Sequence, residues 1–155
     1  MRRVAASAVL ALAMIAGSTS PAAADAPKFH SASSDTLSGG ILEVTFDERG
    51  LGNETVRYIL TADADAVYGC VNGGGKNPSA ANKRTVQAEV SASVDLKPRN
   101  GRISDSLQAG PPDSGTFTCP SGQRLRLLSV RYTNIVLTDD TNGVSTDVPE
   151  ATWPN

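Results

Sequence analysis

The side chains that could perform catalysis are few in this chain of 155 residues. Its single histidine is His30, and its two cysteines are Cys70 and Cys119. A nucleophile activated by histidine, or a histidine-based zinc site, would have to use His30. We interpret His30 as a solvated residue near the start of the mature chain. We predict that the two cysteines form a disulfide, which leaves no thiol nucleophile. These residues therefore predict no catalytic site, no metal site and no cofactor.

Carboxylates remain as a source of proton-transfer chemistry, because glycoside hydrolysis needs only two acids at a suitable separation. Five acidic residues could take part, but no spacing among them selects a pair. They are Glu43, Asp47, Glu48, Glu54 and Glu89. A small hydrolase that uses carboxylates alone is therefore an alternative to the non-enzymatic function that we prefer.

A polar, glycine-rich stretch between Cys70 and Arg84 is the first candidate for ligand binding. Loops on rigid β scaffolds often carry recognition residues, and amide and cationic groups suit polar ligands. The stretch also supports a second alternative, a proteinase inhibitor that presents Lys76 beside a disulfide. Its three successive glycines work against the rigidity that such an inhibitor needs. The predicted binding residues are Asn72, Lys76, Asn77, Asn82, Lys83 and Arg84.

A row of arginines, Arg124, Arg126 and Arg131, is the second candidate for binding. It lies on an otherwise acidic protein. After loss of Arg2 and Arg3 with the signal peptide, 12 Lys and Arg stand against 16 Asp and Glu, a net charge of −4. Mild acidity argues against a nucleic-acid partner, which would select a basic excess. The row instead suits an acidic partner or an anionic wall polymer.

The N-terminus has the pattern of a secretory signal peptide. Arg2 and Arg3 precede an apolar run from Val4 to Ala16, and residues 22–24 form an A-x-A cleavage site. The run is shorter than the about 20 residues that span a bilayer. We therefore predict cleavage near Ala24, secretion and no membrane span. The predicted organisation is a signal peptide over 1–24, a flexible segment over 25–38 that could pair as an edge strand near Lys28, and one β domain over 39–155.

The alternation of apolar and polar residues predicts strands and no amphipathic helix. The strongest signal runs from Arg84 to Leu96, where six apolar residues would share one face of a strand. The phase of the alternation shifts at Leu128, which indicates a β-bulge. Strands are expected over 41–47, 55–62, 66–71, 84–96, 102–107, 116–119, 123–138 and 144–148, with a bend near 63.

These short strands, with a turn every 8–12 residues, predict an antiparallel β-sandwich or Greek-key barrel, immunoglobulin-like in the broad sense. The first two strands are expected to form a hairpin, and Asn100-Gly101 and Asn142-Gly143 are typical hairpin turns. The Cys70–Cys119 disulfide would fasten two strands together. The preferred function is a secreted, non-enzymatic domain that binds an extracellular polar ligand or protein.

Overall fold

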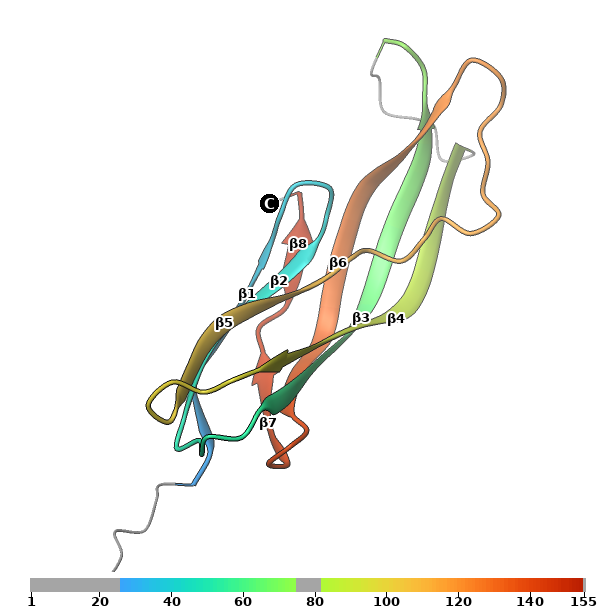
Figure 1. The fold of residues 1–155 in the computed structure, drawn as a ribbon. Helices are drawn as coiled ribbons and strands as arrows, with labels where there is room; N and C mark the ends of the chain where they lie inside the picture. Colours follow the sequence, from blue (N-terminus) through green and yellow to red (C-terminus); the bar gives the residue numbers. More distant parts are fainter. Residues whose placement is uncertain (1–25, 75–81, 155) are drawn as a thin grey trace, which may run out of the picture.

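The computed structural model describes residues 26–74 and 82–154, which form two antiparallel sheets packed face to face (Figure 1). The smaller sheet has the strand order β1-β2-β5. The larger sheet has the order β4-β3-β6-β7, and β8 also pairs with β6. The predicted all-β sandwich is confirmed. The strands are β1 (Lys28–Thr36), β2 (Leu42–Arg49), β3 (Val56–Val71), β4 (Lys83–Leu96), β5 (Arg102–Ala109), β6 (Arg124–Asp139), β7 (Val144–Val148) and β8 (Ala151–Trp153).

Strand β3 is one continuous strand of 16 residues, so the prediction of two strands separated by a bend is wrong. The bend was predicted because alanine and aspartate are uncommon in strands. Packing overrides that preference here. Ala62, Ala64 and Ala66 are buried between the sheets. Asp63 and Asp65 face outward, where they accept hydrogen bonds from neighbouring amides.

The predicted hairpin between the first two strands is also wrong, because β2 pairs with β1 and β5 while β3 pairs with β4 and β6. The Asn100-Gly101 turn likewise has the predicted local geometry but does not join neighbouring strands of one sheet. Both residues have positive φ values, 52° and 72°, and Arg99 and Arg102 exchange two backbone hydrogen bonds across them. The predicted tight turn is therefore present. It nevertheless joins β4 of the larger sheet to β5 of the smaller one.

Residues 110–123 run from β5 along the larger sheet to its far end, and we call this segment the strap (Figure 1). The strand predicted over 116–119 is absent. The chain instead turns at Gly115, whose φ is +63°, and the Phe117 N–H donates to the Ser114 carbonyl, so it is not free for sheet pairing. The Tyr68 hydroxyl of β3 donates a 2.6 Å hydrogen bond to the Pro112 carbonyl. Cys119, near the end of the strap, forms the predicted disulfide with Cys70.

Two strands contain bulges that re-aim their side chains. In β6 the register with β3 shifts between the partners of Val67 and Tyr68, which leaves Leu128 as the extra residue. The bulge predicted from the phase shift is confirmed. In β1 the register with β2 shifts between Phe29 and Ser31, so His30 is the extra residue, and it is exposed. Strand β1 extends to Thr36, well beyond the short edge strand that was considered near Lys28.

Gly40, between β1 and β2, is the point where the smaller sheet's first turn meets the larger sheet. Its φ is +77°, and an added Cβ atom would lie 2.7 Å from Leu127 Cδ2 and 2.8 Å from Val130 Cγ1. The Gly40 carbonyl accepts a hydrogen bond of 2.5 Å from the buried Tyr132 hydroxyl. The turn therefore leaves no room for a side chain at this residue.

Replacing Gly40 with alanine is expected to lower the free energy of unfolding by about 2–3 kcal/mol, because it combines left-handed strain with overpacking. Gly39→Ala is the matched control. Gly39 has a φ of +81° but nothing within 4 Å of an added Cβ, so only the strain of about 1 kcal/mol applies. Urea denaturation measures both variants. Equal losses would show that the contact with Leu127 and Val130 is unimportant.

Candidate functional site

The far end of the larger sheet brings together residues from both sequence candidates. Gly69 of β3 is the register partner of Lys83 on β4 and of Arg126 on β6. Directly opposite residues of antiparallel strands share a face, so two cations flank a position that has no side chain. Arg124 lies opposite Val71, two residues further along β3. We call Lys83, Arg124 and Arg126 the cation cluster.

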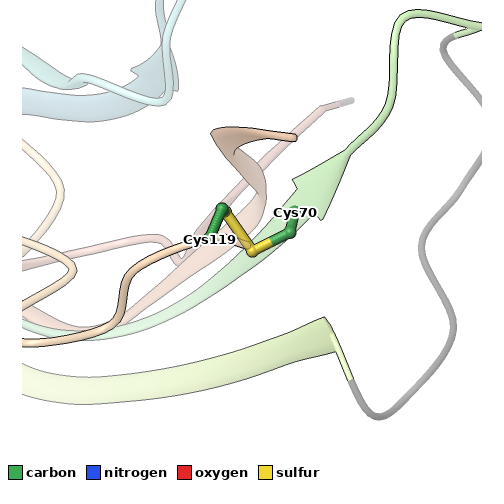
Figure 2. Close-up of a disulfide and its surroundings, with 2 residues drawn as sticks. All are labelled: Cys70 and Cys119. Atoms are coloured by element: carbon green, nitrogen blue, oxygen red, sulfur yellow. A yellow bond between two sulfur atoms is a disulfide. The ribbon is translucent and has the colours of Figure 1, made fainter. Parts of the chain in front are cut away.

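The cation cluster lies on the outer face of the sheet. Tyr68 and Cys70 point inward, toward the strap, and alternation along β3 then places Gly69 and its partners on the opposite face. Figure 2 shows the disulfide that fastens the strap to the end of β3, with the two Cα atoms 5.4 Å apart. The disulfide therefore anchors the strap to the inner face of the sheet, opposite the face that carries the cation cluster.

Not all predicted binding residues belong to this cluster. Arg84 is the register partner of the inward-facing Tyr68, so the sheet separates it from Lys83. Asn82 is half-buried just before β4. Lys76 and Asn77 lie outside the described residues, as does the predicted signal peptide, and the inhibitor alternative therefore stays a prediction.

The cluster has no acidic partner among the described residues. Three other arginines do have acidic partners: Arg49 and Arg102 pair with Asp47, and Arg131 pairs with Glu150 at 2.5 Å. The hydrogen bond that Arg131 donates to the Glu150 carboxylate, together with the charge of Glu150, raises the pKa of Arg131. Arg131, predicted to continue the arginine row, is thus occupied within the protein. The three cations of the cluster are exposed and available to an external anion.

A depression of about 550 Å³ adjoins the cluster at the same end of the sheet. Arg124 and Arg126 form part of its wall, and the predicted binding residue Asn72 adds an amide. Its lining comprises Val71, Asn72, Gly73, Gly122, Arg124, Arg126, Leu127 and Leu128. Cations and an amide around one hollow suit an anionic ligand that also accepts hydrogen bonds.

Two carboxyl groups lie in the core at the opposite end of the sandwich. Glu48 of β2 and Asp139 of β6 are both 0% exposed. The Tyr58 hydroxyl donates a 2.7 Å hydrogen bond to Glu48 Oε2, whereas Glu48 Oε1 has no partner among the described residues. Asp139 accepts hydrogen bonds from the backbone and the side-chain amide of Asn142, at 2.8 and 2.6 Å.

The surroundings of Glu48 disfavour its charged form. Burial raises the pKa of Glu48 to about 7, and the nearby charge of Asp139 acts in the same direction, while the hydrogen bond from Tyr58 opposes them. Burial also raises the pKa of Tyr58. A substrate could not reach this pair without opening the core, so its geometry favours a structural role.

The remaining acidic candidates lie outside the core. Glu54 and Glu89 are exposed, and Glu43 and Asp47 lie on the outer face of the smaller sheet, where Asp47 is only 7% exposed and pairs with Arg49 and Arg102. Partial burial alone would raise the pKa of Asp47, but hydrogen bonds and charges from Arg102 and Arg49 outweigh it and hold the pKa below its usual range. Glu43 accepts a 2.8 Å hydrogen bond from Gln108. No group of three or more potential metal ligands occurs among the described histidine, cysteine, aspartate and glutamate residues.

Sequence reasoning missed two features of these sites. The meeting of Lys83 and Arg126 across Gly69 depends on strand register, which the sequence does not specify. The burial of Glu48 had a visible signal, because Glu48 continues the inward series that begins at Leu42. The strand predicted over 41–47 ended one residue before Glu48, so this signal was not used.

No family model, curated protein or solved structure matches this chain. Within the described residues, no helix is long and apolar enough to span a membrane.

Proposed function

We propose that this protein is a secreted, non-enzymatic β-sandwich that binds a polymer with repeated negative charges through the cation cluster. The observation that carries the proposal is the row Lys83–Gly69–Arg126, in which two exposed cations flank a position without a side chain. Arg124 extends this row toward the adjoining depression. Lys83 from the polar stretch and Arg124 and Arg126 from the arginine row thus form one proposed site.

The spacing of the cluster favours a linear polymer over a single small anion. Neighbouring strands lie about 4.8 Å apart, so Lys83 and Arg126 start from backbones about 10 Å apart. Arg124 and Arg126 are separated by about 7 Å along β6. Each exposed ion pair contributes at most about 1 kcal/mol. A chain with repeated charges can form several such contacts at once, which gives useful affinity on a flat surface.

Other features support secretion and a non-enzymatic role. The Cys70–Cys119 disulfide fits an oxidising compartment, and the N-terminal pattern predicts export. The disulfide removes both thiols from nucleophilic chemistry. Glu48 and Asp139, the carboxyl pair in the core, are inaccessible to a substrate in this conformation.

The double variant Lys83→Ala/Arg126→Ala is expected to bind poly(glycerol phosphate) about 5- to 10-fold more weakly than the unmodified protein, because two charge contacts are lost. Isothermal titration calorimetry at low ionic strength measures the affinity, which should fall as salt is added. Poly-L-glutamate, in a parallel titration, separates a preference for phosphate from a preference for any polyanion.

Arg57→Ala/Lys97→Ala is the matched control, because it removes two exposed cations outside the cluster and changes the net charge equally. This variant should keep the affinity of the unmodified protein. Equal weakening in both double variants would mean that the affinity depends on the net charge of the protein and not on the cation cluster. Absence of binding to both polymers would refute the proposal.

A further inference from the structure

We infer that the free edge of β4 pairs with β4 of a second copy of this chain, which would extend the larger sheet across two molecules. Strand β4 pairs with β3 on one edge through 14 consecutive residues without a register shift. Along its other edge, no backbone hydrogen bond occurs among the described residues. The inference is independent of the proposed polymer site.

From Val86 to Leu96, a stretch that excludes Lys83 and the inward-facing Arg84, the β4 edge lacks the features that usually prevent strands from adding to a sheet. It contains no proline and no bulge, and no charged residue points inward between Val86 and Leu96. Long, regular edges of this kind present unpaired N–H and C=O groups to another strand. Its inward apolar residues Val90, Ala92 and Val94 are only half-buried, so a second strand would cover more of them.

The other sheet edges of the described sandwich are protected. Strand β1 is bulged at His30. Strands β7 and β8 have five and three residues, and Pro149 and Glu150 separate them. Strand β5 lies next to β4 where the chain changes sheet (Figure 1). Only β4, among the described edges, combines length, regularity and freedom from pairing.

A second copy fits this edge because β4 is nearly self-complementary in the antiparallel direction. A two-fold axis at Val90 would place Val86 opposite Val94 of the second copy, and Ala88 opposite its Ala92. An axis at Ser91 also keeps apolar residues opposite apolar residues. In both registers the outward-facing Glu89 meets a serine of the second copy. Movement by one residue would set apolar side chains against polar ones.

Sedimentation equilibrium of the chain from Asp25 onward, the predicted mature form, tests this pairing. We expect a reversible rise in average mass toward twice the monomer value as the concentration approaches about 1 mM, since a single strand pair makes a small interface. Ser91→Glu is expected to raise the dimer dissociation constant at least about 10-fold, because it places like charges opposite each other in both registers.

Thr45→Glu is the matched control, because Thr45 is exposed on the smaller sheet and the substitution adds the same charge. It should leave the dimer unchanged. Circular dichroism checks that each variant is folded. If Ser91→Glu is not, the pair Gln87→Glu/Ser93→Glu replaces it, because it places like charges opposite each other in both registers. A protein that stays monomeric at 1 mM overturns the inference. So does an equal effect of Ser91→Glu and Thr45→Glu, since the dimer would then use another surface.

Discussion

Replacing both Cys70 and Cys119 by alanine is expected to lower the free energy of unfolding by about 4 kcal/mol. The disulfide joins residues separated by 49 positions, and closing a loop of this length removes that much conformational freedom from the unfolded chain in the chain-entropy description. Domains of ordinary stability unfold with about 5–15 kcal/mol. The bridge therefore supplies a large part of the total.

The structural consequence of losing the disulfide should be concentrated at the far end of the larger sheet. There the strap is held to β3 by the disulfide and by the hydrogen bond from Tyr68 to Pro112. Hydrogen exchange of Gly69 and Val71 should accelerate more than that of Leu60, which is buried in the middle of the core.

Urea denaturation with and without reductant measures the contribution of the disulfide. Reductant should lower the free energy of unfolding of the unmodified protein and leave that of the double alanine variant unchanged. The variant therefore controls for any effect of reductant that does not act through the disulfide. A loss below about 1 kcal/mol would mean that the strap and the end of β3 stay associated without the bond.

Stability is also expected to depend on pH through Glu48. Its pKa rises from 4.5 to about 7 on folding, so the native state keeps a proton that the unfolded chain releases between these values. The resulting stabilisation is complete below about pH 4.5 and is lost as the pH rises through about 7. The total loss in the free energy of unfolding is about 3 kcal/mol. The lowered pKa of Asp47 acts oppositely, and its stabilisation is lost only in acid.

Glu48→Gln should remove most of this loss between pH 5 and pH 8. Glutamine is neutral at every pH, and its amide oxygen can still accept the hydrogen bond from Tyr58. Urea denaturation across this range measures the slope. Glu54→Gln, at an exposed turn, is the control and should keep the slope of the unmodified protein. A slope that persists in Glu48→Gln would place the titrating group elsewhere.

Local patterns predicted much of the fold because they are set by nearby residues. The alternation from Arg84 to Leu96 specified β4, the shift at Leu128 specified a bulge, and Asn100-Gly101 specified a tight turn. None of these patterns identifies the neighbouring strand. The Asn100-Gly101 turn therefore exists as predicted, while the strands around it belong to different sheets.

The sequence identified individual residues of the site but did not predict which of them lie close together. Lys83 and Arg126 were recognised in separate segments, 43 positions apart by their residue numbers. Their meeting depends on the register of β3 with two other strands. That register follows from burial along the whole length of β3. The small alanines of β3 fit between the sheets, although their low strand preference had predicted a bend at this point.

Nuclear magnetic resonance can locate a polyanion bound at the cation cluster. Uniformly nitrogen-labelled protein would be titrated with poly(glycerol phosphate) while amide shifts are recorded. We expect the largest shifts at Gly69, Lys83 and Arg126, and we expect Lys83→Ala/Arg126→Ala to need about 5- to 10-fold more polymer to reach half of the shift at Gly69. Shifts centred on the groove lined by Lys97, Arg99 and Arg102, or no shifts at saturating polymer, would contradict the account.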